Sequence, residues 1–323
     1  MEKIYDYDAV LYDRRFMSCG QRHAIVFLAE RGVPVNLLFC SAWMSSDLVY
    51  QQVIVDKRPK YAFECDFYEP QDLARIGVTI HELNAENYED IAQQVDKGID
   101  ALGFVLLSGD VFYFPHCPEY RNAHASHIVV LRAKHANGLW QVVDDNAASV
   151  LCEYQYDAEM VERFFNNNFD RKLRHFELAP NFDRDAAKQS SLERLAALVR
   201  VRQDSGRFYD EILDIYNAPY DSLTIKLKAL HDAFCLLSGS RSCVAQYLSE
   251  VGAPTPLVQD MRTFAEQAMA LKGMMVKGQI TRNVNREKLR TMCSVLKELD
   301  LKISESMVSF CRTQNVGADV LPI

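Results

Sequence analysis

The chain has 323 residues, of which 49% are hydrophobic and 25% are charged, so it is long enough for two domains and too apolar for a disordered protein. Its formal net charge is −8, and residues 1–175 carry −9 of it against +1 for residues 176–323. An acidic first half disfavours nucleic acid as a partner, because phosphates would be repelled, and favours a cationic small substrate.

The lengths of the apolar runs, the N-terminal residues and the cysteines indicate where the protein is expected to act. No apolar run approaches the roughly 18 residues that cross a membrane, so we expect no membrane partner. The first residues show no charged segment followed by an apolar one, so we expect no secretory signal and a cytoplasmic protein. There the nine cysteines are expected as free thiols. Their number is odd and no CxxC occurs, which favours neither a zinc site nor a disulfide framework.

The first half of the chain mixes helical and strand patterns. Ser18 is a typical N-cap residue, and the apolar spacing predicts a helix from Cys19 to about Arg31, closed by Gly32. Further helices are expected near residues 36–50 and 86–99. Strands are then expected at 101–107, 111–114, 127–133 and 139–144, the last two as an antiparallel hairpin around Asn137-Gly138.

The second half shows helical spacing only. Helices are expected at residues 186–203, 222–237, 257–273 and 286–312. The stretch 180–183 (PNFD) is a reasonable boundary. We therefore predict an α+β fold: one domain over residues 1–178 that carries the chemistry, and an all-helical domain over residues 179–323.

Cys19 is the most suggestive residue for chemistry. It follows the expected N-cap Ser18 at a helix start, where the positive end of the helix dipole and unpaired backbone N–H groups stabilise a thiolate. The alternative is a small buried side chain that happens to begin a helix. Cys117 lacks a helix start, so we interpret it as incidental.

Two further residues complete a nucleophilic site. His127 begins an apolar strand and Asp144 ends the next one, so a hairpin brings them side by side. The carboxylate then accepts from one ring nitrogen and leaves the other for the thiol, which is the logic of acyl-transfer sites. His124 competes with His127 for this position. Asp145 competes with Asp144, since strand alternation lets only one of them face the histidine.

These residues occur in an order that resembles a known family. Ser18-Cys19-Gly20 opens a helix, VFYFPHCPEYRNAHASHIVVL follows, and LWQVVDD comes next. This set is similar to the N-terminal domain of the butirosin biosynthesis protein H family, a papain-like module distantly similar to C39 peptidases. The resemblance covers residues 13–175, and the helical half is consistent with the same family.

The resemblance implies an acyltransferase of specialised-metabolite (antibiotic) biosynthesis. In such an enzyme Cys19 would take the acyl or aminoacyl group from a carrier-protein thioester and pass it to a small amine. His127 would act as base, and Asp144 would orient it. No bound cofactor is expected; the donor would be the phosphopantetheine arm of an acyl or peptidyl carrier protein. The sequence has no glycine-rich phosphate loop followed by lysine, which agrees with a reaction that needs no nucleotide.

One position departs from the papain-like pattern. Such enzymes place a glutamine six residues before the cysteine as an oxyanion-hole donor, and this chain has Asp13 there. Tyr12, Arg14 or Gln21 are the alternatives for that donor, and the sequence does not choose among them. Two other functions stay open: a thioesterase or cysteine peptidase with the same triad, and a non-catalytic papain-like binding module.

The substrate-binding candidates come from the aromatic-rich segment 112–120. Tyr113 and Tyr120 would form a stiff wall and Glu119 would hold an amine, with Gln21 added from the helix start. A packed connection is the competing interpretation of this segment. In the helical half, Arg282, Arg286 and Arg290 are spaced to share one helix face, which would receive an acidic carrier protein; a solvated face is the alternative.

Overall fold

The computed structural model describes residues 3–219 and 221–314, and its contacts divide them into two compact units. The first unit comprises the chain up to Tyr12, then Ser18–Val33 and Gly77–Phe182. The second comprises Asp13–Met17, Pro34–Ile76 and the described chain from Asp183 onward. The predicted α+β class is confirmed, with a sheet in the first unit and helices in the second.

The division breaks after Phe182 instead of at residue 178, and residues 13–17 and 34–76 group otherwise than predicted. Residues 34–76, which we placed in the first domain, group with the C-terminal helices. The physical reason is an apolar 3-10 segment, η2 (Val35–Ala42), which is almost wholly buried. It packs against helices α6 (Arg184–Val201) and α9 (Leu223–Glu250) of the second unit. Sequence order alone predicts contiguous domains, and it carries no signal for this exchange of a segment.

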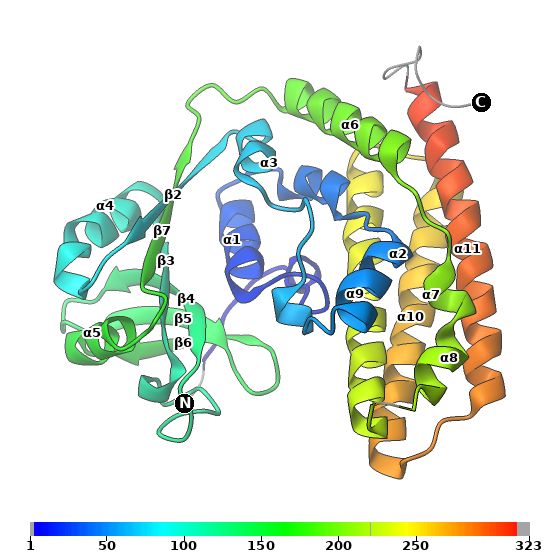
Figure 1. The fold of residues 1–323 in the computed structure, drawn as a ribbon. Helices are drawn as coiled ribbons and strands as arrows, with labels where there is room; N and C mark the ends of the chain where they lie inside the picture. Colours follow the sequence, from blue (N-terminus) through cyan, green and yellow to red (C-terminus); the bar gives the residue numbers. More distant parts are fainter. Residues whose placement is uncertain (1–2, 220, 315–323) are drawn as a thin grey trace. The chain divides into compact units, whose positions relative to one another are not determined.

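A seven-stranded antiparallel sheet forms the first unit, in the order β1-β6-β5-β4-β3-β7-β2 (Figure 1). The predicted hairpin is confirmed as β4 and β5, whereas β1, β2, β6 and β7 were not expected. The strands are β1 (Lys3–Ile4), β2 (Val78–Asn84), β3 (Val105–Asp110), β4 (Ser126–Lys134), β5 (Trp140–Asp145), β6 (Leu151–Tyr156) and β7 (Lys172–Leu178).

Two expectations beside β3 were wrong in detail. Residues 101 and 102 still belong to a helix, which Gly103 ends with a φ of 78° before the strand begins. Residues 111–114 are not a strand, because the carboxylate of Asp110 accepts the backbone N–H of Phe112 at 3.0 Å and starts a 3-10 turn.

The helices of the first unit cover both faces of the sheet. Gly98 of α4 lies against Val105, and Phe164 of α5 lies against Gly109, so both helices are on one face of β3. Helix α1 packs on the opposite face, where its Gly20 meets Ile128 of β4. The bounds are α1 (Cys19–Glu30), α4 (Ala92–Leu102) and α5 (Ala158–Asn166), with 3-10 turns η1 (Ala9–Leu11), η5 (Tyr88–Asp90) and η6 (Val111–Tyr113).

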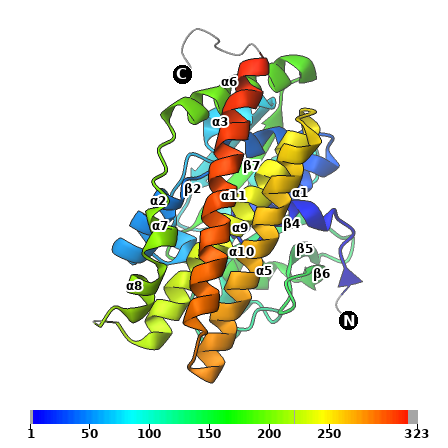
Figure 2. The ribbon, with the colours of Figure 1, turned by 90° about the vertical axis from the view of Figure 1, so that its right-hand side faces the viewer.

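Three long helices, α9, α10 and α11, run side by side in the second unit (Figures 1 and 2). Arg241 of α9 is fully buried and donates to both oxygens of Asp300 of α11, at 2.7 and 2.8 Å. The remaining elements are short apart from α6. The bounds are α2 (Ser46–Val49), η3 (Tyr50–Val55), η4 (Lys60–Ala62), α3 (Pro70–Arg75), α6 (Arg184–Val201), α7 (Arg207–Asp210), α8 (Ile212–Asn217), α9 (Leu223–Glu250), α10 (Thr255–Thr281) and α11 (Arg286–Thr313).

Two helical expectations in this unit need correction. The helix expected at 36–50 is interrupted, because the Ser45 hydroxyl accepts the Leu48 N–H at 3.1 Å and begins a new helix. The expected face of three arginines does not exist as one helix face. Arg282 ends α10 with a left-handed φ of 55°, and α11 begins only at Arg286.

Across the described part of the chain, none of the helices has both the length and the apolar character that a membrane crossing requires.

Two glycines inside helices give a test of this packing. A Cβ added at Gly98 would lie 2.5 Å from Cγ1 of Val105 and 3.1 Å from Cβ of His175, whereas a Cβ at the exposed Gly273 of α10 would meet nothing within 4 Å. We expect Gly98→Ala to lower the free energy of unfolding by about 1–3 kcal/mol. Gly273→Ala should raise it by up to about 1 kcal/mol, because alanine stabilises helix interiors. Urea unfolding followed by circular dichroism measures both, and a stabilised Gly98→Ala variant would contradict the close approach of α4 to the sheet.

Candidate active site

The nucleophile candidate sits at a firmly capped helix start. The Ser18 hydroxyl accepts the Gln21 N–H at 3.4 Å, and the Gln21 side-chain oxygen accepts the Ser18 N–H at 2.9 Å. This capping box fixes Cys19 as the first residue of α1 and leaves its thiol at the positive end of the helix. The Cys19 side chain is partly buried, so it is both sheltered and reachable.

His127 meets the thiol from β4. The Cys19 sulfur is hydrogen-bonded to the His127 ring and also accepts the backbone N–H of Ile128. Within the described residues, the recorded pairing of β4 with β5 ends at Val130 and Val143. The strands therefore separate before residue 128, and its N–H is turned to the sulfur instead of to β5.

Asp144 holds the other side of the histidine ring. Nε2 of His127 lies 2.9 and 3.0 Å from the two carboxylate oxygens. Because Nε2 faces the acid, Nδ1 is the nitrogen left for the thiol. The β4–β5 register, continued one residue beyond its last pair of Val130 with Val143, sets Asp144 opposite Val129. His127 is then its diagonal neighbour on the same face and not its direct partner. The structure thus brings together Cys19, His127 and Asp144.

The electrostatics of the three groups are coupled. Burial raises the pKa of the Cys19 thiol, but the hydrogen bond and charge of His127, together with Arg22, outweigh it and leave the pKa below its usual value. Burial lowers the pKa of His127, while Asp144 and Cys19 raise it well above the usual value. Burial likewise opposes ionisation of Asp144, yet His127 and His116 hold its pKa well below normal. A thiolate facing an imidazolium is the state these shifts favour.

Two histidines beside Asp144 were missed from the sequence. Nε2 of His116 lies 2.8 Å from Oδ2 of Asp144, and Nε2 of His23 lies 3.5 Å from Oδ1. His23 occurs four residues after Cys19 on α1, a spacing that could have placed it on the same face. Burial lowers the pKa of His23 to about 3, with Arg22 and His127 adding to the shift against Asp144, so it stays neutral. His116 lies in a turn, and no periodic pattern links it to Asp144.

The competing residues have other partners. Nδ1 of His124 lies 2.6 Å from Asp110, and its side chain is 67% exposed. Asp145 pairs with Arg22 at 3.5 Å, while its backbone N–H donates to Asp144 at 2.8 Å. The geometry therefore favours His127 over His124 and Asp144 over Asp145, in line with the prediction; their catalytic roles remain a prediction.

The candidates for an oxyanion-hole donor are sorted by their contacts. Asp13 and Arg14 belong to the second unit, where the Asp13 carboxylate accepts from Arg15. Tyr12 is buried, with its hydroxyl 3.0 Å from Nε2 of His23. The Gln21 side-chain oxygen is used in the capping box, as described above.

The substrate-binding candidates lie in one segment that follows β3. Tyr113 belongs to η6 and packs in part against the core between the sheet and helix α5. Glu119 and Tyr120 lie in the next turn, both half-buried, and Tyr120 stacks under the Arg121 guanidinium, whose Cζ is 5.0 Å from its ring centroid. Their contact with substrate stays a prediction, as does that of Gln21.

Burial separates Cys19 from the other thiols. It raises the pKa of Cys40 to about 11, of Cys65 to about 12 and of Cys293 to about 12. Burial and the charges of Asp144 and Glu119 raise the pKa of Cys117 further still. Of the cysteines whose shift is resolved in the described chain, Cys19 is the one with a lowered pKa.

Metal-ligand spacing occurs at one edge of the site. His116, Cys117 and Asp144 place a nitrogen, a sulfur and an oxygen within 4.8 Å of one another. The Asp144 oxygens already accept histidine N–H groups, and the Cys117 thiol is held protonated by its raised pKa. The expectation that the chain uses no metal stays a prediction.

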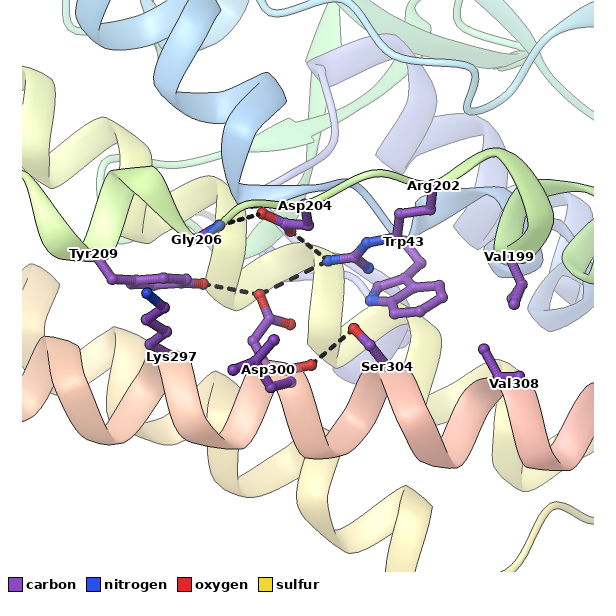
Figure 3. Close-up of a pocket in the computed structure, with 11 residues that line it drawn as sticks. Trp43, Val199, Arg202, Asp204, Gly206, Tyr209, Lys297, Asp300, Ser304 and Val308 are labelled. Atoms are coloured by element: carbon purple, nitrogen blue, oxygen red, sulfur yellow. Dashed lines mark hydrogen bonds and ion pairs between the residues drawn. The ribbon is translucent and has the colours of Figure 1, made fainter. Parts of the chain in front are cut away.

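A pocket in the second unit has a different character (Figure 3). Its volume is about 160 Å³, and the described residues that line it include no cysteine and no histidine. Arg202 stacks 3.8 Å above the Trp43 ring and pairs with Asp204 at 2.7 Å, while Tyr209 donates to Asp300 at 3.0 Å. These charges pair with one another, so we interpret the cluster as structural.

Comparison with known proteins shows that the chain is similar in sequence to an enzyme. It is 24% identical over 212 residues, 62% of this chain and 67% of the relative, to a transferase of Niallia circulans, the butirosin biosynthesis protein H. Its name describes transfer of 4-(γ-L-glutamylamino)-(S)-2-hydroxybutanoate from an acyl-carrier protein to ribostamycin. No family model matches the chain. The distant relationship expected from the sequence is therefore confirmed.

The lowered pKa of Cys19 predicts a labelling order. With limiting iodoacetamide at neutral pH, Cys19 should be alkylated before the other eight cysteines, since the thiolate is the reactive form. Asp144→Asn should slow this labelling by about tenfold or more. Loss of the carboxylate charge lowers the pKa of His127, and an uncharged His127 leaves a smaller fraction of Cys19 as thiolate. Peptide mapping by mass spectrometry reads both, with His124→Gln as control. Preferential labelling of Cys117 would contradict the assignment.

Proposed function

We propose that the protein is a cysteine-dependent acyltransferase that moves an acyl or aminoacyl group from a carrier-protein thioester to an amine. The observation that carries the proposal is the hydrogen-bonded series Cys19–His127–Asp144 at the start of α1. The distant relationship to a carrier-protein-dependent transferase supports the same reaction class. The setting we propose is specialised-metabolite biosynthesis in the cytoplasm, with no membrane or nucleic acid involved.

The reaction has two halves with balanced protons. The Cys19 thiolate attacks the donor carbonyl, the carbon–sulfur bond to the phosphopantetheine arm breaks, and the His127 imidazolium protonates the departing thiolate. The acyl group is then a thioester on Cys19 and His127 is neutral. An amine attacks this thioester, His127 takes the amine proton, and Cys19 leaves as a thiolate. The thiolate–imidazolium pair is thereby restored.

The negative charge that develops on the carbonyl oxygen needs donors. The backbone N–H of Cys19 lies in the first turn of α1, where helix N–H groups have no intrahelical acceptor. Arg22 lies one turn further, its side chain is 9% exposed, and its charge already stabilises the Cys19 thiolate. We assign Arg22 the electrostatic part of the role that Asp13 cannot fill, since an ionised carboxylate donates no hydrogen bond.

Intact-protein mass spectrometry tests the proposal. Mixed with a panel of acyl-loaded carrier proteins, the chain should gain the acyl mass, and peptide mapping should place it on Cys19. Cys19→Ser should gain nothing through a thioester, and Cys117→Ser is the matched control that should be acylated as the wild type is. Added amine should remove the label as an amide product.

Other outcomes select other functions. Loss of the label to water at the same rate with and without amine would indicate a thioesterase. Cleavage of peptides without acylation by any carrier protein would indicate a peptidase. No covalent label with any donor, together with carrier binding, would indicate a binding module and contradict the proposed transfer.

A further inference from the structure

His116 is held by a closed set of contacts around Asp144. Its Nε2 lies 2.8 Å from Oδ2 of Asp144, its Nδ1 lies 2.7 Å from the Tyr156 hydroxyl, and the Tyr156 oxygen accepts the backbone N–H of His116. The imidazole is 2% exposed and stacks on Tyr154 at 4.0 Å between ring centroids. The triad predicted from the sequence does not include His116.

These contacts fix the tautomer of His116. An ionised carboxylate only accepts, so Nε2 of His116 must carry a proton. Nδ1 is then an acceptor, and the Tyr156 hydroxyl supplies its proton. Burial raises the pKa of Tyr156 well above normal, so this hydroxyl stays protonated and can donate. Asp144 therefore requires the proton on Nε2, and the Tyr156 hydroxyl holds Nδ1 on the other side of the ring.

We propose that His116, oriented by Tyr156, is a positioning residue that holds the Asp144 carboxylate ionised and turned toward His127. Its N–H donates to Oδ2, which Nε2 of His127 approaches at 3.0 Å, while Oδ1 receives His127 at 2.9 Å and the Asp145 N–H at 2.8 Å. Without it, Oδ2 of this buried carboxylate loses its shorter hydrogen bond and keeps only the contact with His127, so the acid protonates more easily. The inference deepens the proposed function and rests on its Cys19–His127 pair.

Other titratable groups around Asp144 cannot replace this N–H. His23 from α1 is neutral and at 3.5 Å, and Arg22 is directed to Asp145. Cys117 keeps its proton and lies 3.6 Å from Nε2 of His116. Among the described residues, the other titratable groups at the site include His127 on β4, Asp145 on β5, Tyr154 and Tyr156 on β6, Glu119 in the turn after η6, Tyr12 beside His23, and Cys19 beside His127.

The test is the pH profile of Cys19 alkylation, which needs neither carrier protein nor acceptor. In His116→Ala the acid limb of the profile should move up by about one pH unit, because Asp144 protonates at higher pH when it loses a donor. At a pH on that limb, labelling falls about tenfold, while the plateau rate changes less than about twofold. His116→Gln retains an N–H near Nε2 and should restore the wild-type limb. Tyr156→Phe should shift the limb in the same direction by less.

His124→Gln is the matched control, because it alters another histidine–aspartate pair and should leave the limb unchanged. Thermal unfolding of each variant checks that the fold persists, and Tyr156→Phe keeps the test open if His116→Ala unfolds. An unmoved limb in His116→Ala, or an equal shift in His116→Gln, would overturn the proposal and leave His116 a packing residue. An unreactive Cys19 in the wild-type chain would instead overturn the proposed nucleophile.

Discussion

The arrangement of the first unit depends on one buried negative charge. The Asp144 side chain is 1% exposed, and leaving a carboxylate there without donors would cost several kcal/mol. Its donors come from separate elements: His127 from β4, His116 from the turn after η6, and the backbone N–H of Asp145 from β5 itself. Satisfying this charge therefore fixes the ends of the strands relative to one another, at the edge where α1 begins.

The Asp144 charge affects the Cys19 thiol through the imidazole ring of His127. Asp144 raises the pKa of His127, and the charged ring in turn lowers the pKa of Cys19 against the effect of burial. The capping box of α1 and the Ile128 N–H add dipoles that favour the same thiolate. The buried Asp144 thus favours the Cys19 thiolate without touching it, and the groups that offset the cost of its burial include His127 itself.

The sequence predicts those parts of this site that depend on local patterns. Ser18 as a cap, Cys19 at a helix start and the β4–β5 hairpin all follow from short-range chemistry. His116 follows η6, which a local Asp110 cap starts in place of an expected strand, and its contact with Asp144 joins residues 28 apart in the chain, a pairing that no periodic pattern encodes. The exchange of residues 34–76 into the second unit and the edge strands β1 and β2 are long-range in the same sense, since periodicity does not encode which surface a segment covers.

We infer that Cys19 is a thiolate at neutral pH because Asp144 keeps the His127 ring protonated. The ultraviolet absorbance of thiolate, taken as wild type minus Cys19→Ser and titrated from acid to alkaline pH, measures it most directly. We expect the difference spectrum to show one thiolate at neutral pH and none at acid pH. In Asp144→Asn the neutral-pH signal should be lost. A signal that appears only above a pH of about 8.5, as for an ordinary thiol, would contradict it.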